Sequence, residues 1–134
     1  MDNEYVAEWF QYADRDLATA EHLSSNMYPQ PLEIICFHCQ QAVEKYLKGY
    51  LIFRGLAEPP KIHNLFILGD MCKEHDGRFC EVERACNALN RYGVQPRYPN
   101  ELKVTEYDMQ KALEHARQIR DFELLAEVRG EAGQ

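Results

Sequence analysis

The sequence predicts an all-α protein, an up-and-down antiparallel bundle of four to five helices. Apolar residues recur at spacings of three and four in several segments, and proline- and glycine-containing stretches separate these segments. No segment alternates apolar and polar residues over enough length to suggest a strand. The 134 residues, 46% of them apolar, suit one hydrophobic core, so we expect a single domain over residues 1–134 with a polar tail after about residue 128.

The first two helices are predicted over residues 3–25 and from Leu32 to about Phe53. Two prolines in the segment 28–31 cannot continue a helix and therefore form the connector. The second segment is more apolar than the first, and we expect it to be the central helix. Gly55 follows its end and is able to adopt a left-handed cap.

Two shorter helices are predicted next. Pro59 and Pro60 form a stiff loop that leads into a helix beginning after His63, and a fourth helical segment runs from Phe79 to about Leu89. Each shows apolar residues on one face at helical spacing.

A long irregular loop is predicted over residues 90–103, which mix glycine, prolines, tyrosines and arginines. Loops of this length often carry function. The last helix begins at Thr105, with Asp108 three residues later as an imperfect capping box, and continues through Leu125.

The charge distribution points to the middle of the chain as the place for an anion. The net charge of -7 argues against broad nonspecific binding of nucleic acid, because such binding depends on neutralising phosphates. Residues 40–103, however, carry ten basic and eight acidic residues, whereas both flanking segments are acidic. An anion site is therefore expected in this middle segment.

Nothing in the sequence indicates export or a membrane span. The chain begins without a basic stretch followed by an apolar run, and no apolar segment approaches the roughly 20 residues that cross a bilayer. Five cysteines without an export signal are expected to stay reduced. We therefore expect a cytoplasmic protein.

Several motifs occur in a characteristic order: the segment 36–48, Pro60, His63-Asn64-Leu65, Tyr92 and Arg97-Tyr98-Pro99. In order and spacing they resemble the HEPN domain family over nearly the whole chain. The resemblance implies a helical bundle that is often a homodimer and that in bacteria frequently pairs with a small nucleotidyltransferase, sometimes as a toxin and antitoxin. Many relatives are metal-independent ribonucleases.

The ribonuclease signature of that family is an arginine and a histidine with four to six residues between them, near the start of the last long helix. Here Arg97 stands near the expected place, but the next histidine is His115. Arg15 and His22 match the count in the first helix, which is the wrong element. Without the histidine, the usual mechanism lacks its acid or base, so binding is favoured over catalysis.

The candidate site combines cations that suit a phosphate with aromatic rings that suit a base. The candidate nucleotide- or RNA-binding residues are Lys45, Lys48, His63, Tyr92, Arg97 and Tyr98. Two alternatives stay open: the lysines are solvated or paired with an acid such as Glu44, and the tyrosines only attach the loop to the bundle.

Cys36 and Cys39 form a Cys-x-x-Cys pair, but both lie within a predicted helix and no second pair stands at ligand spacing. No metal site and no cofactor are therefore expected. His38, between these cysteines, is either a hydrogen-bonded core histidine or a functional group.

Three hypotheses follow. The first is a noncatalytic or weakly catalytic HEPN protein that dimerises, binds a nucleotide or RNA, and works beside a nucleotidyltransferase. The second is an endoribonuclease toxin in which His38, His63 or Arg97 is catalytic. The third is a structural dimerisation module without a ligand.

Trp9, Phe10 and Tyr12 exceed what one buried stripe of the first helix can cover. We therefore expect one of these three aromatic side chains to face another molecule or the loop.

Overall fold

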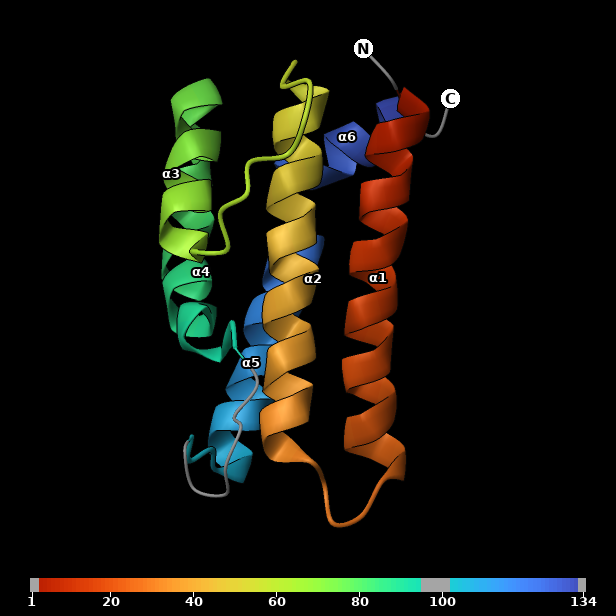
Figure 1. Cartoon of the computed structure of the whole chain (residues 1–134), viewed down its shortest axis with the longest axis vertical. Coiled ribbons are helices and arrows are strands. Elements are labelled where there is room, and N and C mark those ends of the chain that lie inside the picture. Colours follow the sequence, from red (N-terminus) through yellow and green to blue (C-terminus); the bar gives the residue numbers. More distant parts are fainter. Residues whose placement is uncertain (1–2, 95–101, 133–134) are drawn as a thin grey trace.

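The computed structural model describes residues 3–94 and 102–132 and consists of helices joined by turns (Figure 1). The α-helices are α1 (Asn3–Asn26), α2 (Leu32–Phe53), α3 (Leu65–His75), α4 (Glu83–Leu89), α5 (Glu106–Arg120) and α6 (Glu123–Ala132). Two 3₁₀ helices, η1 (Gly77–Val82) and η2 (Asn90–Tyr92), flank α4. The all-α bundle predicted from the sequence is confirmed.

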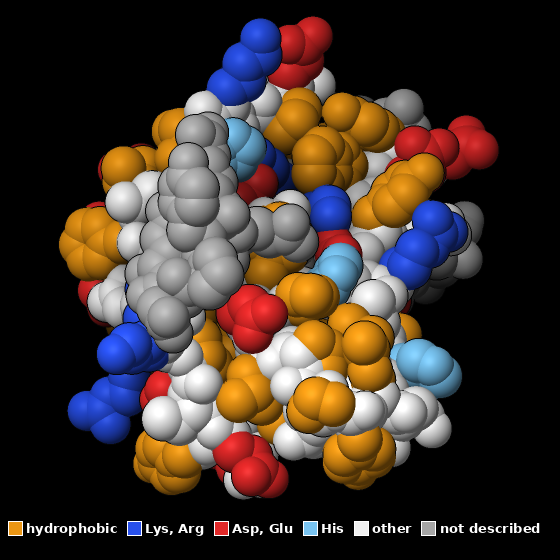
Figure 2. Space-filling model, turned by 60° about the horizontal axis from the view of Figure 1, so that its bottom comes forward, with side chains coloured by type: hydrophobic (Ala, Val, Ile, Leu, Met, Phe, Trp, Pro, Cys, Tyr) orange, Lys and Arg blue, Asp and Glu red, His pale blue; other side chains and the backbone are white. Residues whose placement is uncertain are grey.

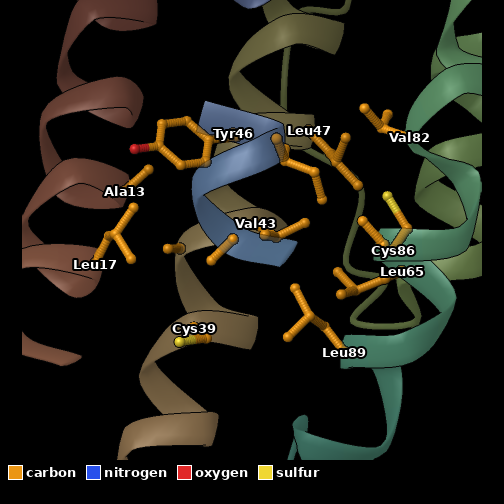
Figure 3. Close-up of a cluster of buried hydrophobic side chains, with 14 of the residues drawn as sticks. Ala13, Leu17, Cys39, Val43, Tyr46, Leu47, Leu65, Val82, Cys86 and Leu89 are labelled. Atoms are coloured by element: carbon orange, nitrogen blue, oxygen red, sulfur yellow. The ribbon is translucent and has the colours of Figure 1, made fainter. Parts of the chain in front are cut away.

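Helix α2 is the centre of the bundle and packs against α1, α3, α4, α5 and α6. Its neighbours supply the core shown in Figure 3, where Leu17 of α1, Val43 and Tyr46 of α2, and Leu89 of α4 point toward one another. A helix surrounded in this way must be apolar on most of its sides, which explains why this segment is the most apolar of the sequence.

Caps fix the ends of the helices that position the site. After α2, Gly55 has φ of +110°, and the N–H groups of Gly55 and Leu56 donate to the carbonyls of Ile52 and Leu51, as in a Schellman motif. At the start of α5, the predicted capping box is complete: Thr105 and Asp108 each accept the other's backbone N–H at 3.0 Å.

The last helical segment differs from the prediction, since α5 ends at Arg120 and α6 begins at Glu123. At the break, Phe122 turns into the core and packs edge-to-face on Phe79, with 5.3 Å between ring centroids. The new direction lays α6 along α1, where Arg129 reaches Asp14. Helix α6 also continues past Val128 to Ala132, into the segment predicted as a polar tail.

The three aromatic residues of α1 have different environments. Phe10 is buried and Trp9 is partly buried against the core, whereas the ring of Tyr12 is 53% exposed. Tyr12 is therefore the one that faces away from the bundle. None of the helices in the described part of the chain is long and apolar enough to cross a bilayer.

Candidate functional site

A buried polar network lies in the middle of α2, a mostly apolar helix. Its members Gln40, Glu44 and Lys48 are spaced by four residues, so their side chains share one helix face. Lys48 Nζ lies 3.1 Å from Glu44 Oε2, and Gln40 Nε2 donates to Glu44 Oε1 at 3.2 Å. The side chains of Lys48 and Glu44 are only 7% and 9% exposed. We call Gln40, Glu44, Lys48 and His63 the α2 network.

The connector between α2 and α3 brings His63 to this network. After the Gly55 cap the chain turns back along α2 (Figure 1). The carbonyl of His63 accepts a hydrogen bond from Gln40 Nε2 at 3.3 Å, and the ring nitrogen Nδ1 lies 3.0 Å from Glu44 Oε2. Asn64 then caps α3 by accepting the N–H groups of Phe66 and Ile67. His63 is therefore held at both its backbone and its ring.

The segment after α4 also reaches the network. Asn90 Oδ1 accepts the N–H of Leu65 at 2.8 Å, which attaches η2 to the start of α3. Gly93 lies so close to Gln40 that a Cβ on Gly93 would be 3.4 Å from Gln40 Nε2. The connector between α2 and α3 and the segment after α4 thus both reach α2 at this network. Residues 95–101 follow directly after this segment in the sequence.

The geometry leaves one nitrogen of His63 available for chemistry. An ionised carboxylate only accepts hydrogen bonds, so the ring donates from Nδ1 to Glu44 and Nε2 is left to accept a proton or contact a ligand. Because the side chain of His63 is 75% exposed, Nε2 is open to solvent. A carboxylate that holds the other ring nitrogen is the arrangement that orients histidines in many binding and catalytic sites.

A second network lies beside the first, between α1 and α2. His38 Nδ1 is 3.1 Å from Asp16 Oδ1, and Lys45 Nζ donates to Asp16 Oδ2. The side chains of His38 and Lys45 are about three-quarters buried. In the space-filling view, basic, acidic and histidine side chains lie near one another among hydrophobic ones (Figure 2).

The structure divides the predicted site residues between these networks. Lys48 and His63 come together on Glu44, whereas Lys45 joins Asp16 and His38 instead. Both lysines are paired with acids, which agrees with the alternative that they are solvated or paired rather than free to bind a phosphate. Lys48 thus meets Glu44, the acid named in that alternative, while Lys45 meets an acid on a different helix.

Of the two predicted tyrosines and the predicted arginine of the loop, only Tyr92 lies within the described residues. Tyr92 is buried at 5% exposure, and the guanidinium of Arg91 covers its ring at 4.7 Å from the centroid. Its ring is thus packed into the fold and does not present an open face to a base. Arg97 and Tyr98 lie outside the described residues.

The cysteines of the Cys-x-x-Cys pair are both buried in α2. Burial raises the pKa of the Cys36 thiol to about 12 and raises that of Cys39 as well, which keeps both thiols protonated. Among the described residues, no three His, Cys, Asp or Glu side chains are grouped to hold a metal ion.

The residues that sequence reasoning missed are Gln40, Glu44 as the centre of a network, and Asp16. A signal for the first two exists: polar residues at positions 40, 44 and 48 repeat every four residues on a mostly apolar helix. Asp16 gives no such signal, because its partners His38 and Lys45 lie on another helix.

Comparison with known proteins agrees with the fold described above. The crystal structure of TT1696 from Thermus thermophilus superposes with a TM-score of 0.70 at 24% sequence identity, covering 96% of this chain and 98% of that one. No curated protein matches the sequence significantly. The family model of the HEPN domain matches residues 6–127, nearly the whole chain. The chain therefore belongs to the HEPN domain family.

Proposed function

We propose that this HEPN-domain protein binds a nucleotide or a segment of RNA at the α2 network and acts as a binding protein rather than as the usual ribonuclease. The proposal rests on the environment of His63. Its ring is exposed, yet the buried carboxylate of Glu44 holds it in one orientation. Buried polar networks are costly unless every group is satisfied, so a network that ends in one exposed ring suggests a site.

Charge at the network suits a single phosphate better than a long polyanion. Lys48 and Glu44 neutralise each other, and Lys45 and Asp16 do the same in the neighbouring network, so extra positive charge must come from a protonated histidine or from Arg97. The chain enters the segment that contains Arg97 and Tyr98 beside Gln40. We include these two residues in the proposed site, for a phosphate and a base respectively.

The proposal is tested by equilibrium binding of fluorescently labelled adenosine monophosphate and a labelled short RNA. His63→Ala and Arg97→Ala are expected to weaken binding by about tenfold or more, the usual effect of losing one charge-assisted hydrogen bond. The matched control is His22→Ala, which removes an exposed histidine whose hydrogen bonds, within the described residues, are to Asn26 of its own helix. Wild-type protein that binds neither probe, or variants that bind as the wild type does, would overturn the proposal.

A second candidate function is a metal-independent endoribonuclease, and the two carboxylate–histidine pairs favour it. Glu44 orients His63 and Asp16 orients His38 through Nδ1, which leaves each Nε2 to act as acid or base. Cleavage of labelled total RNA in the presence of a chelator, lost in His63→Ala or His38→Ala, would establish this activity. If the wild-type protein does not cleave the RNA, the endoribonuclease function is excluded and the binding function stands.

The proposed setting is a cytoplasmic homodimer that works with a nucleotidyltransferase, as in toxin–antitoxin pairs of the family. Exposed apolar side chains at the turn between α1 and α2 provide a surface for self-association, namely Met27, Tyr28 and Ile34. Co-expression with an adjacent open reading frame that encodes a nucleotidyltransferase should yield a stoichiometric complex. If Arg97→Ala instead abolishes the dimer and no ligand binds, the chain is a structural dimerisation module.

A further inference from the structure

A second group of cations lies away from the α2 network, on α4 and α5. These helices run side by side (Figure 1). Arg84, Ala88 and Arg91 are spaced by four and three residues, so they share one face of α4 and η2. On α5, Lys111 and His115 have the same spacing of four.

The two faces form the walls of one pocket. Arg91, Lys111 and His115 line it together with Ala88 and Ala112, two small residues that leave room between the helices. We call this pocket the α4–α5 groove. Tyr92 and Asp108 complete its lining.

The helices pass each other in opposite directions, which spreads the cations along the groove. At one end Arg91 lies 3.5 Å from Asp108, near the start of α5. At the other end His115 lines the groove, and Lys111 lies one helical turn before it on α5.

Two cations, Arg91 and Lys111, and one carboxylate, Asp108, line the groove, in a chain whose net charge is -7. Arg84 forms no ion pair within the described residues, and Arg91 has only the long contact to Asp108. Lys111 pairs with Glu114 on the outer side of α5, where both side chains are exposed and the pair is weak. The side chains of Arg91 and Lys111 are 50% and 45% exposed, so a ligand in the groove can reach both.

Arg91 is also held in place. Its guanidinium lies over the ring of Tyr92, 4.7 Å from the centroid, and that ring is buried in the fold. Asp108 is occupied as the cap of α5, accepting the backbone N–H of Thr105 at 3.0 Å. A stacked arginine loses less freedom when it binds an anion, and its fork of donors fits the oxygens of a phosphate.

We propose that the α4–α5 groove binds a phosphate group, held by Arg91 and Lys111 with His115 as a third contact. The groove is a separate site from the α2 network and does not depend on the function proposed there. Burial and the charges of Lys111 and Arg84 lower the pKa of His115 against the opposing charge of Glu114, so the ring is neutral near pH 7 and can donate or accept a hydrogen bond.

The test follows the C2–H resonance of His115 by NMR in the full-length protein, during separate titrations with inorganic phosphate, adenosine monophosphate and a short RNA. A saturable shift of this resonance is expected with at least one of the three. Shifts with inorganic phosphate identify a site for a free phosphate group, whereas shifts with RNA alone identify a contact to the nucleic-acid backbone; both support the groove. Arg91→Gln or Lys111→Gln should weaken the apparent affinity by about tenfold.

Lys73→Gln is the matched control, since it removes the same charge from α3, where Lys73 pairs with Asp70 and Glu83. It should leave the titration of His115 unchanged. The experiment distinguishes the two proposed sites. A probe that shifts the His63 resonance but never that of His115 overturns phosphate binding in the groove and leaves binding at the α2 network intact. Equal shifts of His115 in wild type, Arg91→Gln and Lys111→Gln would also overturn it.

Discussion

Glu44 is the residue on which the candidate site depends, because Lys48, His63 and Gln40 all contact its carboxylate. It is also nearly enclosed by protein. A buried carboxylate without a cation beside it is expensive, whereas a buried pair is close to neutral in free energy. The position of His63 is thus coupled to the presence of Lys48.

Lys48→Met should lower the free energy of unfolding by about 3 kcal/mol, the low end for removing one partner of a buried pair, since Gln40 and His63 still contact Glu44. Glu44→Gln combined with Lys48→Met should recover most of this loss, because no unpaired charge then remains. Urea denaturation measures both. The control Lys73→Met, in an exposed pair, should change stability by no more than about 0.5 kcal/mol. Losses that simply add in the double variant would show that the two charges are not coupled.

Asp14 makes the stability of the bundle sensitive to acid. Burial raises its pKa, but hydrogen bonds from Arg129 and Tyr46 outweigh this and hold the pKa below the ordinary value of 3.8. A carboxyl with a lowered pKa in the folded state contributes stability that is complete above its unfolded pKa and is lost as pH falls through the folded one.

Asp14→Asn should therefore reduce the loss of stability on going from pH 5 to pH 2, although it weakens the protein at neutral pH by leaving Arg129 without its partner. Urea midpoints across this pH range provide the measurement. Asp70→Asn, which removes an exposed carboxylate that pairs with Lys73, serves as the control. An acid response in Asp14→Asn as steep as in the wild type would exclude this role.

At the scale of the elements, the contact between α1 and α2 depends on the absence of a side chain at Gly49. A Cβ there would lie 2.7 Å from the Phe10 ring and 3.1 Å from Trp9 Cβ. The Phe10 ring cannot easily move, because Tyr46 packs on it edge-to-face and Arg129 lies over it. The two helices thus approach closely at this point.

Gly49→Ala should destabilise the protein by about 1–3 kcal/mol, as overpacking does in well-packed cores, even though alanine is the better helix former. Gly130→Ala is the matched control, because a Cβ at Gly130 of α6 meets nothing within 4 Å. That variant should be neutral or slightly stabilising. Thermal unfolding compares the stability of the two variants with that of the wild type. A Gly49→Ala variant more stable than the wild type would contradict the close packing of α1 on α2.

At the scale of the whole molecule, local signals predict the elements well. The connector prolines, Gly55 and the Thr105–Asp108 box act within a few residues of where they stand, so the helix boundaries that they define agree with the structure. The break between α5 and α6 is different. Phe122 continues the apolar spacing of the helix, and only its packing on Phe79 of a distant segment turns the chain.

The candidate site divides in the same way. The contact of Lys48 with Glu44 is a local one, four residues apart, and is among the alternatives that the sequence leaves open. The contact of Lys45 with Asp16 joins two helices and depends on how they are rotated against each other, which hydrophobic periodicity fixes only to within a broad face. The partners of His38 and His63 escape prediction for the same reason.

Binding of a nucleotide or RNA where Glu44 holds His63 can be followed through the histidine ring resonances of the full-length protein. During titration with adenosine monophosphate or a short RNA, we expect the ring resonance of His63 to shift saturably while those of His22 and His75, which are exposed on α1 and α3, stay in place. The same titration of Glu44→Gln should show a weaker response. A His63 resonance that does not move with either probe, or that moves no more than that of His22, would show that neither ligand binds beside Glu44.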